Sequence, residues 1–409
     1  MRYKEFLPYN KQFIDASDVK AVVKVLQSDF LTTGPECLNF EKNFARYVGS
    51  KYAVAVNNGT SALYLSMLAL GIQKNDKVIT SPNTFVADAN VIRLVRADVL
   101  FSDIELDTGN LDLDLIESLI KKNKKVKAII AVHFAGYPID MKRLRAICKR
   151  LNILIVEDGC HALGSSYKID RKKRYRVGSC KHSDLTTFSF HPIKNITTGE
   201  GGAITTNSKR LYKLLLQLRN HGITRDKELF RNKLLSSTRY KEKNIKNEWY
   251  YESQLLSENF RITDFQCALG NSQLKKLNKF IIKRKSLVDQ YIINLRSETN
   301  NEIGFFKYHS TNYTAFHLFC IKIDFSKIHG GRARIMNLLK KDGIGSQVHY
   351  IPIYKFPYYQ NYFKKKIILN NTEKHYQTTL SLPLHYSMTL DMPKFIIKRL
   401  YKHITESKK

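Results

Sequence analysis

Short apolar runs alternate with amphipathic stretches through the first half of the chain. Such runs, bounded by turn residues, are typical of strands buried on both faces of a parallel sheet. They lie at residues 54–56, 77–80, 99–103, 127–132, 153–157, 186–190 and 202–206. Helical spacing of apolar residues lies between or after them, at residues 113–121, 141–151 and 208–220. This alternation predicts an α/β fold in which helices cover both faces of a mostly parallel sheet.

The pattern changes in the last third of the chain. Apolar residues keep helical spacing over residues 264–295, which predicts one long helix. Beyond it, the apolar residues 318–321 and the turn at residues 343–345 predict a smaller α+β unit. A chain of 409 residues is long enough for two domains. We therefore predict a large domain over residues 1–260 and a small C-terminal α+β domain over residues 261–409.

A single lysine stands between an apolar, strand-like run and a Gly-rich turn. The segment reads FSFHPIKNITTGEGG over residues 188–202, and the lysine is Lys194. Burial lowers the pKa of a lysine toward neutrality, and only the neutral amine is a nucleophile. Lys194 is therefore a candidate for a Schiff base with a carbonyl ligand. The alternative is an ordinary surface lysine, because a Lys-rich chain has many of those.

An acidic residue, Asp158, follows the apolar run at residues 153–157. Ligands of parallel sheets bind beyond the carboxyl ends of the strands, which is where Asp158 stands. A carboxylate there can pair with a pyridinium nitrogen and keep it protonated, which makes the ring an electron sink. The alternative for Asp158 is a helix N-cap or a turn residue. His161 either lies against the same ligand or is a satisfied histidine in a packed turn.

A third candidate element is a Gly-Thr-Ser turn. Gly59, Thr60 and Ser61 follow a strand-like run and open a stretch of good helix formers over residues 62–70. The free N–H groups and the positive end of a helix that starts this way bind phosphate. The alternative is that Thr60 or Ser61 is only an N-cap.

Motifs spread in this order over nearly the whole chain resemble the DegT/DnrJ/StrS family of sugar aminotransferases. They lie at residues 26–35, 40–41, 59–63, 81–87, 157–164, 188–202, 219–222, 259–264 and 347–352. The resemblance implies a pyridoxal 5'-phosphate (PLP) enzyme of aminotransferase fold type I. Within the family, residues 193–202 and 262–274 are similar to the transaminases of the pseudaminic acid pathway. Those enzymes aminate the 4-keto carbon of a UDP-4-keto-6-deoxy-N-acetylhexosamine, and glutamate is the expected amino donor.

The resemblance also implies roles for individual residues at the cofactor. Lys194 would bind PLP covalently and later move the proton between the cofactor and the substrate carbon. Asp158 would pair with the pyridine nitrogen, and His161 would lie near the phenolic oxygen. Phe85 matches the aromatic residue that stacks on the pyridine ring; its alternative is plain core packing. The phosphate would be held by Gly59, Thr60, Ser61 and Ser189.

Other matched residues imply a homodimer whose active site is completed by the partner subunit. Asn259 matches a residue that reaches the cofactor phosphate of the other subunit, and Arg261 lies close to it in the motif. His349 and Tyr350 match a region near the sugar site. Ser257 stands where the family usually has glycine, which bears on the placement of Asn259.

Three further segments depart from the family or from the regular pattern. Gly159 and Cys160 follow Asp158 where the family has two small residues of the Ala or Ser type. The loop at residues 167–178 is longer and more basic than the family turn, with an insertion at residues 168–176. Residues 225–249 are polar and charge-rich with no clear period, and we predict a variable insertion or mobile loop there.

The net charge of +32 raises the question of nucleic-acid binding. The lysines are spread along the whole chain, and the dense clusters at residues 121–125 and 364–366 fall in expected helix ends or loops. No motif that reads DNA or RNA is present. We therefore predict no nucleic-acid partner. Some of the excess charge would help to attract a dianionic UDP-sugar.

The cysteines and the apolar runs bear on the compartment. Six cysteines are scattered without paired spacing, which indicates neither a zinc site nor a disulfide framework. Reduced thiols in a cytosolic protein are the simplest interpretation. The first residues contain no signal-like apolar region, and no apolar run approaches membrane-spanning length. We predict a cytoplasmic protein with no metal and no membrane partner.

Lys194 and Asp158 separate the candidate functions. A nucleotide-sugar 4-aminotransferase needs both residues. Sister enzymes that dehydrate or deoxygenate sugars have a histidine at the lysine position, and a binding protein that had lost the chemistry would show decay at either residue. Both are intact, so we predict a PLP-dependent transaminase. Precursors of bacillosamine, legionaminic acid or perosamine are alternative substrates, and the sequence fixes neither the nucleotide-sugar nor the stereochemistry of the new amine.

Overall fold

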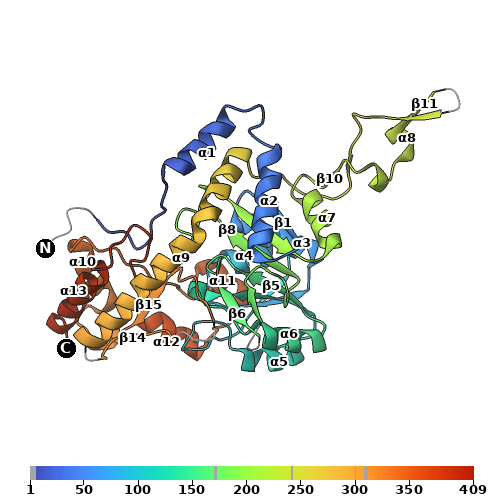
Figure 1. The fold of residues 1–409 in the computed structure, drawn as a ribbon. Helices are drawn as coiled ribbons and strands as arrows, with labels where there is room; N and C mark the ends of the chain where they lie inside the picture. Colours follow the sequence, from blue (N-terminus) through green and yellow to red (C-terminus); the bar gives the residue numbers. More distant parts are fainter. Residues whose placement is uncertain (1–5, 170–172, 241–242, 300, 308–311) are drawn as a thin grey trace.

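A seven-stranded sheet forms the centre of the molecule (Figure 1). The computed structural model describes residues 6–169, 173–240, 243–299, 301–307 and 312–409. The strand order is β1-β9-β8-β5-β4-β2-β3. The strands are β1 (Tyr52–Val56), β2 (Lys77–Thr80), β3 (Asp98–Phe101), β4 (Val126–Val132), β5 (Leu154–Asp158), β8 (Leu185–Ser189) and β9 (Gly202–Thr206). All seven predicted strands are therefore confirmed, with ends that shift by one or two residues.

Only β9 runs against the other strands of this sheet, since it pairs antiparallel with both β1 and β8. A parallel crossover needs about a dozen residues or more and usually a helix. Residues 190–201, which join β8 to β9, contain no helix. The chain therefore turns straight back, and Lys194 lies on this turn. The predicted mostly parallel sheet is confirmed.

The two faces of the sheet carry separate apolar cores, because successive side chains of a strand point to opposite sides. In β1, Ala53 and Ala55 belong to one core while Val54 and Val56 belong to the other. The first core is covered by α2 (Pro35–Val48), α5 (Leu113–Lys122), α6 (Met141–Arg150) and part of α9 (Asp264–Glu298). The second is covered by α3 (Gly59–Ala69), α4 (Ala87–Leu94), α7 (Lys209–Leu218) and α11 (Pro357–Phe363). The predicted helices and the α/β class are confirmed.

A third core lies in the C-terminal part of the chain. It is built from a three-stranded antiparallel sheet and the helices that cover it. These are β14 (Gly304–Phe305), β15 (Phe319–Lys322), β16 (Thr379–Leu382), α10 (Gly331–Lys341) and α13 (Met392–Glu406). Figure 1 shows α9 running from the central sheet to this unit. Leu7 packs in the same core, and its N–H donates to the Gly343 carbonyl at 2.8 Å. The division at residues 260 and 261 stays a prediction.

The remaining elements are short or lie at the edges. They are α1 (Ala16–Leu26), α12 (Asn370–Thr378), β6 (Ser166–Lys168), β7 (Arg174–Arg176), β10 (Ile223–Thr224), β13 (Glu252–Ser253) and the 3-10 turns η1 (Phe134–Gly136), η2 (Lys227–Leu229), η3 (Phe325–Lys327) and η4 (Ile353–Lys355). The strands β6 and β7 form a hairpin within the basic loop at residues 167–178, of which residues 170–172 lie outside the described part. Among the described residues no helix is both long enough and apolar enough to cross a membrane.

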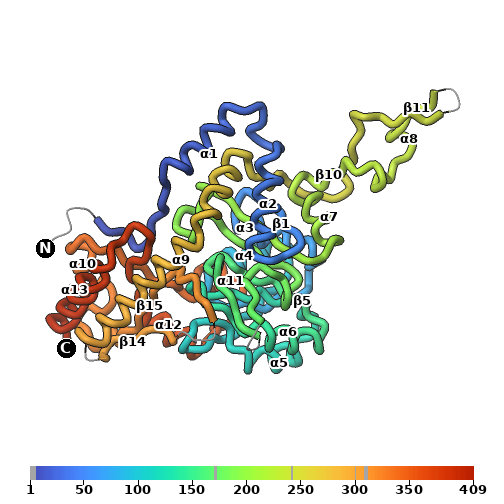
Figure 2. Tube along the Cα trace, viewed as in Figure 1, coloured from blue at the N-terminus to red at the C-terminus, as the bar shows by residue number. Residues whose placement is uncertain are grey.

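The described residues of the segment 225–249, for which we predict a variable insertion or mobile loop, form a projecting arm with short elements of its own. The arm contains α8 (Lys233–Ser236) and the antiparallel strands β11 (Ser237–Tyr240) and β12 (Lys243–Lys246). Figures 1 and 2 show it extending away from the body of the molecule. The two strands were not predicted from sequence, because nearly every one of their residues is exposed. Without a buried face the strands carry no hydrophobic alternation.

Candidate active site

The candidate residues meet where β5 and β8 end and α3 begins. Asp158 is the last residue of β5, Ser189 the last of β8, and Gly59 the first of α3. A Cβ added to Gly59 would lie 2.8 Å from the Cβ of Ser189, so only glycine allows this approach. A Cβ added to Gly202 would likewise lie 2.5 Å from the carbonyl oxygen of Asn58. Segments far apart in sequence therefore converge at the carboxyl edge of the sheet.

Lys194 lies on the turn after β8 and is partly buried. Burial is the main influence on its amine and lowers its pKa, while the negative charge of Asp158 acts in the opposite direction. A lowered pKa increases the fraction of neutral amine, which is the nucleophilic form. These surroundings differ from those of an ordinary surface lysine, the alternative considered from sequence.

Asp158 is buried, and its Oδ1 accepts the N–H of Cys160 at 2.8 Å. The segment that follows is a turn, so Asp158 does not cap a helix. Gly159 has no room for a side chain, because a Cβ would lie 2.7 Å from the ring of Phe188. The glycine at position 159 thus fits the packing of Phe188 against the turn. Burial raises the pKa of the Cys160 thiol well above its ordinary value, which keeps it neutral.

His161 lies in a cluster of buried rings. Its Nε2 is 3.1 Å from the Tyr350 hydroxyl, and its ring centroid is 4.4 Å from that of His317. Its Nδ1 is buried and has no hydrogen-bond partner among the described residues. Burial and the charge of Lys194 hold the pKa of His161 well below its ordinary value. The imidazole is therefore neutral and has one ring nitrogen free for a ligand.

The segment with His349 and Tyr350 meets the same site from the C-terminal part of the chain. Burial and Lys194 lower the pKa of His349 to about 3, and its Nδ1 lies 2.8 Å from the Ser381 hydroxyl. The N–H of Tyr350 donates to Asn83 Oδ1 at 3.2 Å. His349 is thus a neutral, already bonded group, while the Tyr350 hydroxyl faces His161.

The start of α3 fits an anion. Its N-cap is Asn58, whose side chain accepts the N–H of Ser61 at 2.8 Å, so the N-cap alternative for Thr60 and Ser61 is wrong. The first N–H groups of a helix have no acceptor within it, and those of Gly59 and Thr60 are of this kind. Thr60 is exposed and Ser61 is buried beneath it. Together with Ser189, this set of donors suits a phosphate group.

Phe85 and the residues around Asn259 lie apart from the buried cluster. The side chain of Phe85 is 60% exposed, which excludes the core-packing alternative. Asn259 is exposed, and its Oδ1 accepts the N–H of Arg261 at 3.1 Å, while the Arg261 guanidinium donates to Asn220. The hydroxyl of Ser257 donates to the Leu218 carbonyl at 2.6 Å, so the serine fits where the family has glycine. These contacts do not bring Asn259 or Arg261 to Lys194.

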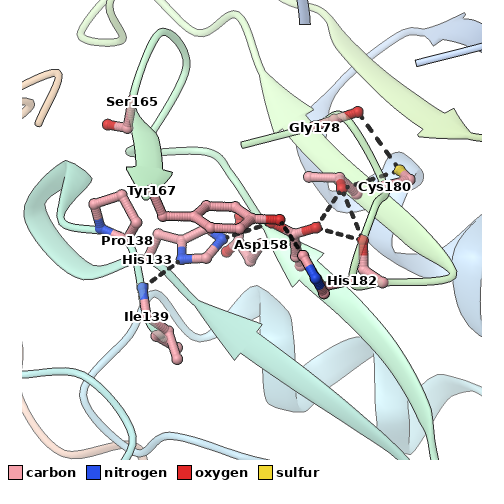
Figure 3. Close-up of polar contacts among 12 residues, drawn as sticks. His133, Pro138, Ile139, Asp158, Ser165, Tyr167, Gly178, Cys180 and His182 are labelled. Carbon is pink, nitrogen blue, oxygen red and sulfur yellow. Dashed lines mark hydrogen bonds and ion pairs between the residues drawn. The ribbon is translucent and has the colours of Figure 1, made fainter. Parts of the chain in front are cut away.

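A buried polar network that includes His133 lies at the end of β5, next to Asp158 (Figure 3). Glu157 Oε2 pairs with His133 Nε2 at 2.9 Å, and His133 Nδ1 accepts the N–H of Ile139 at 3.1 Å. Glu157 Oε1 accepts the hydroxyl groups of Ser183 and Thr186. Because neighbouring residues of a strand point to opposite faces, this network fixes the end of β5 without touching the Asp158 carboxylate.

Replacing Glu157 by alanine is expected to destabilise the protein by about 3–5 kcal/mol, because it leaves His133 buried without its partner. Urea unfolding followed by circular dichroism measures the loss. Glu117→Ala is the matched control, since Glu117 pairs with Lys121 and Arg150 on the surface and should cost about 1 kcal/mol or less. Equal losses in the two variants would contradict a buried network at β5.

Three residues of the site escaped prediction from sequence. Asn83, Asp88 and His317 reach the site through β2, α4 and the C-terminal part of the chain. Asp88 is the one acidic residue in the short stretch Phe85-Val86-Ala87-Asp88-Ala89, but an acid in the first turn of a helix is common. His317 stands among apolar residues in the sequence, and these neighbours were the only sign that the histidine is buried.

Comparison with known proteins places this site in a family. Residues 12–401 match the DegT/DnrJ/EryC1/StrS aminotransferase family. A UDP-4-amino-4,6-dideoxy-N-acetyl-beta-L-altrosamine transaminase of Campylobacter jejuni is 36% identical, over 98% of this chain and 99% of its own. The structure of Helicobacter pylori PseC, an aminotransferase of pseudaminic acid biosynthesis, matches with a TM-score of 0.85 and 31% identity, over 98% of this chain and all of PseC.

A third match is a putative sugar aminotransferase, Spr1654 of Streptococcus pneumoniae, solved in its PLP form. It has a TM-score of 0.85 and 28% identity, and the match covers 98% of this chain and 99% of that one. The overall fold agrees with these matches. The chain belongs to the DegT/DnrJ/EryC1/StrS aminotransferase family and is a PLP-dependent aminotransferase.

Proposed function

We propose that this enzyme transfers an amino group from glutamate to the C4 keto group of a UDP-4-keto-6-deoxy-N-acetylhexosamine, in pseudaminic acid biosynthesis. The observation that carries the proposal is the end-to-end similarity to two enzymes named for that chemistry. The similarity includes residues 347–352, which meet His161 at the site. At about a third identity, related UDP-, GDP- or dTDP-linked keto sugars are the competing substrates.

In this proposal the residues at the carboxyl edge of the sheet hold the cofactor. The first-turn N–H groups of α3, with Ser61 and Ser189, bind its phosphate. Asp158 would pair with its ring nitrogen and favour the protonated form, and Phe85 would cover one face of the ring. When bound, PLP supplies an electron sink and carries the amino group between the two substrates.

Lys194 performs the proton transfer. Its amine would hold PLP, and once free it would be the base nearest the reacting carbons. It then takes a proton from one carbon and returns it to another as general base and general acid, which its lowered pKa favours. The neutral His161 and the Tyr350 hydroxyl orient the oxygen of the ring and exclude water from that side.

A second copy of the chain is proposed to complete the site, with its Asn259 reaching the cofactor phosphate. Asn259 is exposed and does not contact Lys194 of its own chain, as expected for a residue that serves the partner. Arg261 lies beside it and would help to bind an anionic group of the substrate. His349 would border the sugar. The net charge of +32 would raise the local concentration of the dianionic nucleotide-sugar.

Absorbance of the purified protein with PLP tests the proposal. Glutamate should bleach the band of the lysine-bound cofactor, and UDP-4-keto-6-deoxy-N-acetylhexosamine should restore it. Because both half-reactions share one site, initial rates should give parallel double-reciprocal plots. The matched controls are GDP- and dTDP-linked 4-keto-6-deoxyhexoses.

The outcomes separate the parts of the proposal. Recovery of the band with a control sugar alone would move the substrate to that class of nucleotide-sugar. Bleaching by another amino acid but not by glutamate would replace the amino donor. A protein that binds no PLP would contradict the assignment of the site.

A further inference from the structure

A second buried carboxyl group lies beside Asp158. Asp88 is in the first turn of α4 and is 1% exposed. Its Oδ2 accepts the Thr84 hydroxyl at 2.6 Å, while its Oδ1 is buried and has no hydrogen-bond donor among the described residues. The carboxyl groups of Asp88 and Asp158 are within hydrogen-bonding reach of each other. The two acids therefore form a pair at the base of the site.

Two carboxylates in contact inside a protein cannot both be ionised, so the pair holds a proton. The charged and titratable groups that face Asp88 are Asp158, Lys194, Cys160 and Tyr350. Burial raises the pKa of the Cys160 thiol and of the Tyr350 hydroxyl, so both are neutral. Of these four groups, only Lys194 can carry a positive charge that offsets the negative charge of the two carboxyl groups.

The proton belongs on Asp88. Burial and the neighbouring Asp158 raise the pKa of Asp88 well above its ordinary value. The Asp158 carboxylate already accepts the N–H of Cys160 through its Oδ1, and the Asp88 Oδ1 has no such donor among the described residues. A proton on Asp88 Oδ1 also explains why this atom has no donor, because it then donates to Asp158 instead.

We propose that Asp88 is a positioning residue whose neutral carboxyl group donates a hydrogen bond to Asp158 and fixes the orientation of that carboxylate. The Cys160 N–H and Asp88 then hold Asp158 from two sides, and it has a defined direction before any ligand arrives. This role rests on the proposed assignment of Asp158 to the ring nitrogen of PLP. Asparagine at position 88 can make the same two contacts as a protonated aspartate, whereas alanine can make neither.

The first test uses the full chain freed of PLP. A group whose pKa is higher in the folded state contributes stability below its unfolded pKa, near 3.8, and that stability is lost as the pH rises through the folded pKa. Asp88→Asn removes this loss. Its folding equilibrium constant relative to the wild type should therefore grow as the pH rises above about 4, by about tenfold for each unit by which the pKa of Asp88 is raised.

The effect of Asp158 on Asp88 is tested by comparing the folding stability with and without Asp88→Asn in a protein that also carries Asp158→Asn. There the gain from Asp88→Asn should shrink, because the adjacent negative charge is gone. Asp76→Asn is the matched control, since Asp76 is a buried carboxylate at the opposite end of β2 that accepts the N–H of Gln73. An equal gain in both backgrounds, or none in either, would overturn the pairing of Asp88 with Asp158.

The second test uses the PLP-loaded protein. Asp88→Ala should raise the dissociation constant of PLP by about tenfold or more, as loss of a group that orients a ligand does. It should also shift the pH profile of the cofactor absorbance. Asp88→Asn should restore both toward wild type, which a purely structural defect would not predict. Wild-type values in Asp88→Ala, or equal defects in both variants, would overturn the positioning role. Failure of every variant and of the wild type to bind PLP would overturn the proposed function, while the unfolding test still decides the pair.

Discussion

Lys194→Ala is expected to lower kcat for amino transfer by about 10⁴-fold or more while leaving the fold intact. Proton transfer by a positioned side chain alone contributes about 10²–10⁴-fold, and the same residue is proposed to hold the cofactor covalently. Lys194 lies on a turn and is partly buried, so alanine removes no core packing. The loss should therefore appear in kcat, with the thermal unfolding temperature close to wild type.

Borohydride reduction followed by mass spectrometry tests the covalent link separately from the rate. The wild-type chain should gain the mass of the reduced cofactor on the peptide with Lys194, and Lys194→Ala should gain none. Lys209→Ala is the control, because Lys209 is an exposed residue at the start of α7. A Lys194→Ala enzyme within about tenfold of wild-type kcat would exclude the proposed proton transfer.

The strands of the central sheet could be predicted because both of their faces are buried. Residues such as Val54 and Ala55 are apolar on either side of the strand, which leaves a continuous run in the sequence. The reversal of β9 could not be read from such a run, since a buried strand looks the same in either direction. Only the short, helix-free connection through Lys194 decides it.

The projecting arm shows the opposite case. Its strands are held by backbone pairing, such as that of Thr238 with Ile245, and not by a buried face. Pairing of backbone groups does not depend on side-chain type, so the sequence of the arm shows only polarity and charge. Leu7 is a similar case, because it joins the C-terminal core through a contact that no local pattern predicts.

Within the candidate site, the sequence singles out residues that stand at the ends of elements, and their roles stay predictions. Lys194, Asp158 and Gly59 each follow a strand or open a helix, and the structure brings their segments together. Asp88 and His317 could not be predicted, because each acquires its neighbour only when distant elements pack. Asp88 is an ordinary first-turn acid until β5 places Asp158 beside it. The family resemblance supplies roles for matched positions. It gives no signal for residues such as Asp88, which act on a matched residue from behind.

Asp158→Asn is expected to lower kcat by about 10³-fold, the scale of losing one preorganised electrostatic contact to the reacting system. Asparagine still accepts the N–H of Cys160 at the end of β5, so the turn should keep its shape. It carries no negative charge, however, and cannot keep a ring nitrogen protonated. The electron sink is then weakened while binding of the phosphate at α3 is retained, so the loss should lie mainly in kcat and less in the affinity for PLP.

A PLP analogue methylated at the ring nitrogen provides the decisive control, since its positive charge does not depend on a carboxylate. It should recover part of the lost rate in Asp158→Asn and give no gain in the wild type. Asp140→Asn, which removes an exposed carboxylate at the start of α6, should match the wild type with either cofactor. If Asp158→Asn kept kcat within about tenfold, or if the analogue failed to help it, the charge of Asp158 would not act on the ring, and its burial beside Asp88 would need another explanation.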